Sequence, residues 1–121
     1  MAEILSSSCP IPRWELFKQQ LHNVTPEEFD QIIREHPEYI ILDVRTPAEY
    51  QEFHLKGARS MDYLGPDFLD QLDALSPDDT YLVYCRSGRR SVRACTLMRN
   101  AGITQLIHLD GGINAWTNTN F

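Results

Sequence analysis

Hydrophobic residues in this chain gather in short continuous runs, separated by longer segments in which apolar and polar positions alternate. Residues 39–44 and 81–84 are almost wholly apolar, and residues 106–109 form a third run. Continuous apolar runs of this length are typical of central strands in a parallel sheet that is covered on both faces. We therefore predict a strand at each of these three positions.

The segments between the runs carry signals for helix starts. Residues 25–28 and 46–49 both read Thr-Pro-x-Glu, which is a capping box with proline at the first helical position. Another helix is expected after Gly65-Pro66, and a further one over residues 91–101, with Gly102 as its stop. Alternation of strands and helices predicts an α/β fold, whose ligand site lies at the carboxyl ends of the strands.

Residues 1–22 precede this alternation, so we expect an N-terminal extension followed by a single domain over residues 23–121. Trp14, Phe17 and Leu21 recur at helical spacing and predict an amphipathic helix within the extension. Such a helix either docks on the domain's own surface or makes a contact with a dimer partner or another protein. The pattern leaves both interpretations, and the oligomeric state, open.

Composition narrows the class of partner. The chain has 121 residues, enough for one domain with its own core, and no apolar stretch long enough to span a bilayer. Its formal net charge of −6 argues against nucleic acid or an anionic membrane as partners. Residues 1–12 lack the basic start and apolar centre of a signal peptide, so we expect a cytoplasmic protein.

The three cysteines agree with a reducing compartment. Cys9, Cys85 and Cys95 are odd in number, have unrelated spacings and include no Cys-x-x-Cys pair. This pattern argues against a disulfide framework and against a zinc ribbon, and we expect no metal and no cofactor. Cys95 borders the apolar face of the predicted helix and is interpreted as core. Cys9 is interpreted as exposed and incidental, with a sulfur-accepting or resolving thiol as the alternative.

Cys85 stands in a segment of a different kind. Residues 85–90 read Cys-Arg-Ser-Gly-Arg-Arg and directly follow the second apolar run, so this thiol lies between a buried strand and a helix start. Amide groups at the helix start, the helix dipole and guanidinium charge all favour thiolate over thiol. If the chain curls at Ser-Gly, successive amides converge into an anion-binding nest. We interpret Cys85 as a nucleophile, and the residues expected to bind its substrate are Arg86, Ser87, Gly88, Arg89 and Arg90.

Four segments together resemble one family. Residues 82–91, Leu-Val-Tyr-Cys-Arg-Ser-Gly-Arg-Arg-Ser, resemble the active-site loop of rhodanese-type sulfurtransferases. Residues 42–50 are similar to the family's Asp-x-Arg…Glu-Tyr/Phe motif, residues 54–58 to its Gly-His-Ile-x-Gly-Ala turn, and residues 110–116 to its closing Gly-Gly…Trp motif. The likeness covers about residues 23–117. Phe53 and Lys56 depart from the glycine and proline common in that turn, which lies outside the catalytic loop.

The resemblance implies a five-stranded parallel sheet with helices on both faces and a sulfur transfer in two steps. The Cys85 thiolate would take the outer sulfur of an anionic donor such as thiosulfate, release sulfite and hold the sulfur as a persulfide. A thiol or cyanide would then accept it. Asp43 and Arg45 are expected to support the site through an internal ion pair or loop hydrogen bonds, and His54 is interpreted as structural.

Two other functions remain possible. A sulfur-relay or regulatory module would use the same loop but show little turnover on small molecules. A phosphatase or arsenate reductase of the same fold would use Cys-x5-Arg, whereas position 91 here is serine and the last loop arginine falls one residue earlier. The pair Gly111-Gly112 also follows a strand, and a tight turn accounts for it better than a phosphate loop.

Overall fold

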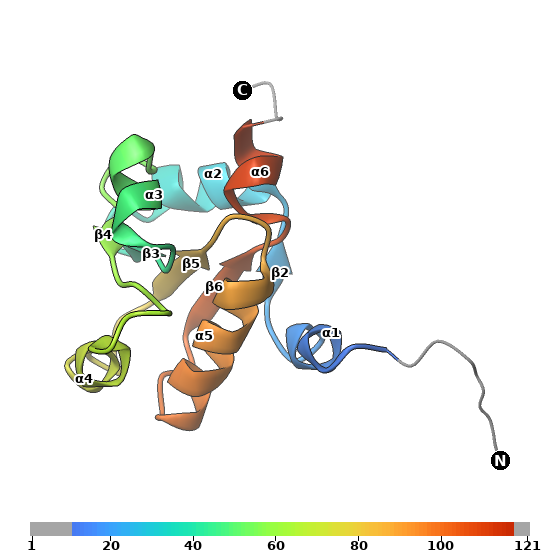
Figure 1. Cartoon of the computed structure of the whole chain (residues 1–121). Helices are drawn as coiled ribbons and strands as arrows, with labels where there is room; N and C mark the ends of the chain where they lie inside the picture. Colours follow the sequence, from blue (N-terminus) through green and yellow to red (C-terminus); the bar gives the residue numbers. More distant parts are fainter. Residues whose placement is uncertain (1–10, 118–121) are drawn as a thin grey trace, which may run out of the picture.

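The structure, a computed structural model, describes residues 11–117. Helices and strands alternate along this part of the chain as the hydrophobic pattern predicts (Figure 1). In chain order they are α1 (Arg13–Lys18), β2 (Asn23–Val24), α2 (Pro26–Glu35), β3 (Ile40–Asp43), α3 (Pro47–Glu52), β4 (Arg59–Ser60), α4 (Phe68–Asp73), β5 (Tyr81–Tyr84), α5 (Arg89–Asn100), β6 (Leu106–Leu109) and α6 (Gly112–Thr117).

The five strands form one parallel sheet in the order β2-β6-β5-β3-β4. The predicted α/β class and the expected five-stranded parallel sheet are thus confirmed. The three apolar runs became the three inner strands, with β5 at the centre. The two edge strands have only two residues each, too few for a hydrophobic pattern, and the sequence did not predict them individually.

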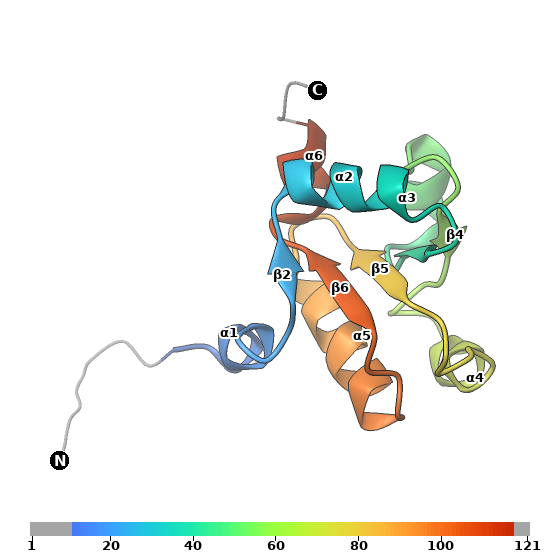
Figure 2. The same cartoon turned by 180° about the vertical axis from the view of Figure 1, so that it is seen from behind.

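Helices cover both faces of the sheet, and each face has its own apolar cluster. Alternate residues of β5 point to opposite faces: Tyr81 and Val83 pack toward α4 and α5, whereas Leu82 and Tyr84 pack toward α2 and α6. In Figure 1, α5 lies in front of the sheet, and Figure 2 shows the strands from the other side. Burial on both faces explains why β5 is apolar at every position.

Both predicted capping boxes are present. The Thr25 side chain accepts a hydrogen bond from the Glu28 amide, and Thr46 does the same for Glu49, with each glutamate returning to the threonine amide. Helix α5 begins at residue 89, two residues earlier than expected, because Gly88 adopts a φ of 113° as its N-cap. Its two leading arginines therefore belong to the first helical turn and not to the loop.

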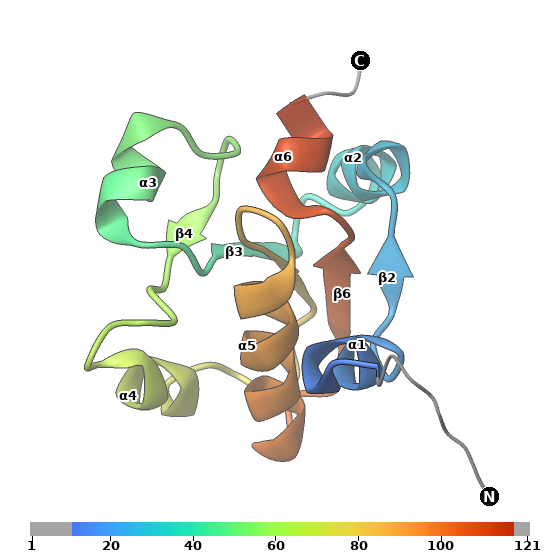
Figure 3. The same cartoon turned by 45° about the vertical axis from the view of Figure 1, so that its right-hand side comes forward.

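The described part of the N-terminal extension lies on the domain. Helix α1 packs beside α5, as Figure 3 shows, and the guanidinium of Arg89 lies 5.1 Å from the ring centre of Trp14. Helix α1 ends before Leu21, which instead packs against the core cluster on the α5 face. The division of the chain at residue 23 stays a prediction. Within residues 11–117, none of the helices combines the length and the apolar character that crossing a membrane requires.

Candidate active site

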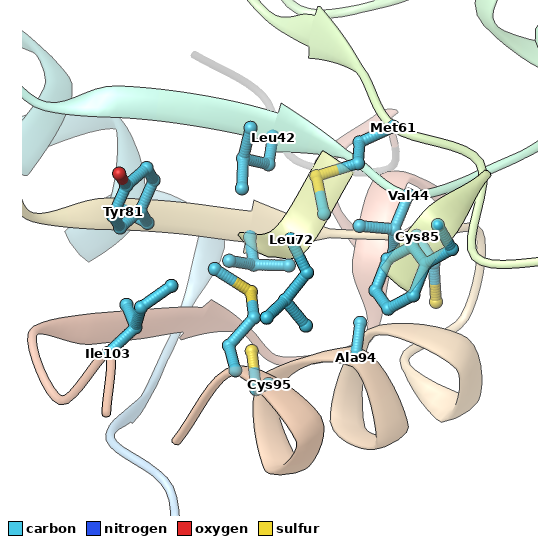
Figure 4. Packing of buried hydrophobic residues seen from close by; sticks show 12 residues of the cluster. Leu42, Val44, Met61, Leu72, Tyr81, Cys85, Ala94, Cys95 and Ile103 are labelled. Atoms are coloured by element: carbon cyan, nitrogen blue, oxygen red, sulfur yellow. The ribbon is translucent and has the colours of Figure 1, made fainter. Parts of the chain in front are cut away.

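Cys85 lies directly after β5, at the carboxyl end of the central strand of the sheet. The residue is 1% exposed, and Figure 4 shows it in the core cluster near Val44 and Ala94. The Gly88 amide donates a hydrogen bond to the cysteine sulfur at 3.1 Å. A backbone donor aimed at the sulfur is a contact that stabilises negative charge developing on it in a reaction.

Helix α6 holds the loop from the other side. The amides of Ile113 and Asn114 donate hydrogen bonds to the carbonyl oxygens of Cys85 and Arg86, at 2.8 and 3.0 Å. Gly112 has a φ of 63°, and a Cβ at this position would lie 2.5 Å from both of these oxygens. The glycine pair therefore makes a tight turn, as expected, and it allows close approach to the backbone of the cysteine loop.

The three arginines that the sequence placed in the cysteine loop have different surroundings. Arg86 and Arg90 both bind the carboxylate of Glu49: the Arg86 Nε lies 3.0 Å from it, and Arg90 makes two hydrogen bonds at 2.7 and 3.0 Å. The hydrogen bonds from Arg90, followed by those from Thr46, lower the pKa of Glu49. Arg89 is exposed and lies over the ring of Trp14. Of the expected substrate-binding arginines, two thus share one carboxylate.

Glu49 is a site residue that the sequence reasoning missed, because it was interpreted as a capping-box residue and as part of the motif over residues 42–50, with no contact to the cysteine loop. Its oxygen Oε1 accepts from the Thr46 amide at 3.1 Å while the same carboxylate binds both arginines. Glu49 thereby joins the start of α3 to the cysteine loop. Of the remaining expected loop residues, Ser87 is exposed and Gly88 is buried.

The supporting pair expected in the sequence is present. Arg45 binds the carboxylate of Asp43 through Nε and Nη2, the latter at 2.7 Å, and both residues are almost fully buried. The Tyr84 hydroxyl donates to Asp43 at 2.7 Å and accepts from the Leu55 amide at 3.1 Å. This network joins β3, β5 and the turn that follows α3. Burial raises the pKa of Tyr84, which keeps the hydroxyl a donor.

His54 takes no part in the cysteine loop. Its Nδ1 lies 2.7 Å from the Tyr50 carbonyl oxygen, and its ring stacks on the ring of Tyr50 with centres 3.8 Å apart. These contacts agree with the structural role expected for it.

A second feature that sequence reasoning missed lies behind the cysteine. The Ser91 hydroxyl oxygen is 3.2 Å from the Cys85 sulfur and 2.6 Å from Nε2 of His108. The histidine's Nδ1 is 2.8 Å from Oδ1 of Asn23. Burial lowers the pKa of His108 to about 4. The available signal was a histidine in an otherwise apolar strand, at a position that faces α5.

Cys95, the other cysteine within the described residues, differs from Cys85. Cys95 is fully buried in the core, as predicted, and burial raises the pKa of its thiol. Cys9 lies outside the described residues. Within residues 11–117, no three His, Cys, Asp or Glu side chains gather in a way that could hold a metal ion.

Comparison with known proteins places this site in a family context. A family model described as "Rhodanese-like domain" matches residues 25–119. Over 85 residues the chain is 38% identical to thiosulfate sulfurtransferase 16, chloroplastic, of Arabidopsis thaliana, a match that covers 62% of this chain and 71% of that protein. The chain spans between 24% and 71% of the length of the first two curated relatives that it matches.

Two solved structures share the fold. The solution structure of a rhodanese-like domain from Anabaena sp. superposes with a TM-score of 0.70 at 27% identity, covering 78% of this chain and 72% of that one. A protein of unknown function from Rhodopseudomonas palustris, described as a possible tyrosine phosphatase, gives a TM-score of 0.76 at 20% identity and covers 93% and 96%. At that identity the second likeness speaks for the fold alone.

Proposed function

The chain belongs to the rhodanese-like domain family, and we propose that it is a sulfurtransferase whose sulfur carrier is Cys85. The single observation that carries the proposal is the position of this thiol. It follows the central strand, lies at a helix start and accepts a hydrogen bond from the Gly88 amide. A sulfur nucleophile held in this way is stabilised as the anion that the chemistry requires.

The reaction has two steps, and in each of them one bond to the transferred sulfur forms while another breaks. In the first, the Cys85 thiolate attacks the outer sulfur of thiosulfate. A bond forms between the two sulfurs, and the bond to the sulfonate group breaks, so sulfite leaves with the electron pair. In the second, a thiolate or cyanide attacks the outer sulfur of the persulfide, and Cys85 leaves as thiolate. The Gly88 amide stabilises negative charge on the Cys85 sulfur both when this sulfur attacks the donor and when it leaves from the persulfide.

An anionic donor is supported by the charge at the loop. The Arg86 side chain is 54% exposed and contacts Glu49 through its Nε. Arg89 is also exposed. Arg86 and Arg89 are thus the residues that we propose to attract the donor. Arg90, which is bound by two hydrogen bonds to Glu49, holds the loop in place. Relatives named as thiosulfate sulfurtransferases support thiosulfate as the donor.

The experiment is to measure intact mass after incubation with thiosulfate. We expect a gain of one sulfur atom, which cyanide removes with formation of thiocyanate. Cys85→Ser should gain nothing, because an alkoxide does not form at neutral pH and oxygen does not form a persulfide. Cys95→Ala is the matched control and should gain the sulfur normally. A stable sulfur adduct on the Cys85→Ser variant would refute the assignment.

A second candidate is a sulfur-relay module that serves a protein partner. This candidate is favoured by relatives that are much longer than the matched segment. In one of them, described as a probable adenylyltransferase/sulfurtransferase, the match covers 24% of the length. Such a module would take up the sulfur stoichiometrically but turn over slowly with cyanide or small thiols. In either case we propose a small anionic donor and a thiol acceptor, acting in a reducing compartment such as the cytoplasm, where Cys85 stays reduced.

A phosphatase activity is disfavoured by the loop. Position 91, where the Cys-x5-Arg signature would have its arginine, is a buried serine hydrogen-bonded to the sulfur. The loop therefore has no guanidinium at the position that would bind a phosphate oxygen. We expect no hydrolysis of p-nitrophenyl phosphate. Hydrolysis of it without sulfur uptake from thiosulfate would reverse the choice between the two activities.

A further inference from the structure

A row of hydrogen-bonded polar side chains, buried at Ser91 and His108 and half-buried at Asn23, runs from the Cys85 sulfur toward the edge of the sheet. It passes from Cys85 to Ser91 on α5, then to His108 on β6 and to Asn23 on β2, with distances of 3.2, 2.6 and 2.8 Å. Asn23 and His108 are direct neighbours in the parallel pairing of their strands. Ser91 and His108 are 0% and 1% exposed. Polar groups buried this deeply are expected to have defined hydrogen-bond partners and directions.

The direction of each hydrogen bond in this row follows from its Asn23 end. The Asn23 amide nitrogen donates to the carbonyl oxygens of Lys18 and Leu21, at 2.9 and 3.2 Å. Its Oδ1 therefore faces His108 as an acceptor, and Nδ1 of the histidine must carry a hydrogen. In the neutral ring, Nε2 is then bare, so its 2.6 Å contact with Ser91 requires the single hydroxyl hydrogen. The Gly88 carbonyl oxygen is the competing acceptor at 3.0 Å, but it already accepts from the Val92 amide. The serine oxygen consequently presents a lone pair to Cys85.

We propose that His108 accepts the proton of the Cys85 thiol through Ser91. The S–H bond breaks and its proton passes to the serine oxygen, while the serine's own proton passes to Nε2 of His108. The products are a Cys85 thiolate, which accepts from the Ser91 hydroxyl, and an imidazolium that donates at both nitrogens. No other reactant is needed. The inference rests on the proposed function only in taking Cys85 as the nucleophile.

The charges around the relay permit this step. Burial disfavours a lone charge on His108, and it lowers the pKa of this group to about 4. The relay forms imidazolium and thiolate together, so the net charge of the buried site does not change. Lys18 and Asp110 act on His108 in opposite senses and are paired with each other at 2.6 Å.

The thiol end of the relay has charged and titratable neighbours of its own. Arg90 and Cys95 both interact electrostatically with Cys85. Arg90 is a cation and favours the thiolate, whereas Cys95 stays a neutral thiol because burial raises its pKa. The carbonyl of Gly88 interacts with the histidine and favours its protonated form. His108 acts through Ser91 and is therefore a positioning residue, while Ser91 touches the reacting sulfur.

The relay has a signature in the pH dependence of Cys85 reactivity. The neutral pair and the thiolate–imidazolium pair contain the same number of protons, so their ratio does not vary with pH. The alkylation rate of Cys85 should therefore level off between about pH 5 and pH 7, above the range where His108 titrates and below the ordinary range of a thiol. For a thiol without a relay, the alkylation rate falls about tenfold for each unit that the pH is lowered in this range.

The experiment measures iodoacetamide alkylation of the full chain, with Cys85 resolved from the other cysteines by peptide mass. We expect a plateau in the wild type and a tenfold loss per pH unit in His108→Gln, whose amide can still accept from Ser91 but is not a base. Ser91→Ala should behave like His108→Gln, and combining the two should add little. Asn23→Ala should lower the plateau about fivefold, because it removes one hydrogen bond to the imidazolium.

The controls separate the relay from general damage. His54→Gln replaces a histidine outside the relay, and Thr96→Ala removes another hydroxyl of α5 that binds a backbone carbonyl. Both should keep the plateau, and circular dichroism checks that each variant is folded. A wild-type rate that falls tenfold per unit, or a plateau that persists in folded His108→Gln, would overturn the relay. Because no sulfur donor is used, a plateau without sulfur transfer would keep the relay and reject the proposed function.

Discussion

The carboxylate of Glu49 accepts two hydrogen bonds from the guanidinium of Arg90, a residue 41 positions further along the chain. The same carboxylate caps α3 through Thr46 and pairs with Arg86. One acidic side chain thus fixes a helix start and the position of two arginines close in sequence to Cys85. Its removal should affect stability and the cysteine loop together.

The Glu49 pair should make stability depend on acid. Because Arg90 lowers the pKa of Glu49 in the folded protein, the pair contributes stability above the unfolded-state pKa of about 4.3 and loses it as pH falls through the lower folded value. We expect Glu49→Gln to reduce the free energy of unfolding at pH 7 by about 2 kcal/mol. The difference from the wild type should shrink from pH 5 toward pH 2 in urea titrations.

Glu28→Gln is the matched control for this change. Glu28 occupies the same capping-box position in α2, and glutamine can cap in its place, but within residues 11–117 no arginine forms an ion pair with it. We expect its effect on unfolding to be much smaller at every pH. An equal loss in both variants would mean that Glu49 stabilises the protein only as a cap.

Arg86 and Arg90 should affect different measurements. Arg86→Ala removes an exposed charge near the sulfur and should raise KM for thiosulfate about tenfold, equivalent to about 1.4 kcal/mol, with little change in Tm. Arg90→Ala leaves Glu49 without its two strongest hydrogen bonds and should lower Tm as well. High salt should weaken the effect of Arg86, because exposed charge is screened.

Arg93→Ala serves as the control for the arginine variants, since it removes an exposed arginine from α5, the helix that also carries Arg89 and Arg90. If Arg86→Ala, Arg89→Ala and Arg90→Ala all keep the wild-type KM, the basic loop serves another purpose, such as docking an acidic partner.

Gly112 should tolerate no side chain. A Cβ there would meet the carbonyl oxygens of Cys85 and Arg86 at 2.5 Å, both of which are held by α6. Gly102→Ala is the control, since its φ is also positive, at 96°, but nothing lies within 4 Å of the added atom. We expect about 1 kcal/mol of destabilisation for Gly102→Ala and at least about 2 kcal/mol more for Gly112→Ala, with loss of sulfur uptake.

A comparable loss of stability in the two glycine variants would contradict the close approach at Gly112. Backbone strain at a positive φ would then account for both losses. Unfolding in urea and sulfur uptake from thiosulfate, measured on both variants, distinguish these cases.

Cys95 should be chemically silent. It is fully buried, and burial raises the pKa of its thiol, so the folded protein should not be alkylated there at pH 8 although the unfolded protein is. Cys95→Ala should keep sulfur transfer and lose about 1 kcal/mol of stability from the small cavity. If this variant no longer forms a persulfide with thiosulfate, the assignment of Cys85 as the only carrier among the described cysteines is wrong.

Local patterns in the sequence predicted much of the framework. The apolar runs of the inner strands, the two capping boxes and the cysteine at a helix start each depend on residues a few positions apart. Interactions of that range recur with the same geometry wherever the local sequence recurs, so they can be inferred without knowing the fold. The α/β class followed from their order along the chain.

Partners that lie far apart in the chain had no such pattern. Nothing near Glu49 indicates that Arg90 would bind it, and nothing near His108 indicates that Asn23 and Ser91 would flank it. Even the edge strand that carries Asn23 is too short to show an apolar period.

The sequence by itself determined the α/β class, the helix starts and the identity of the candidate nucleophile, because each depends on neighbouring residues. Only the tertiary structure decided which charges remain near the sulfur and which buried polar groups lie behind it. The order and register of the strands set those distances: they place His108 beside Asn23, 85 residues away, and α5 places Ser91 between His108 and Cys85. Contacts of this kind arise from packing the two faces of the sheet, and no single segment of the chain encodes them.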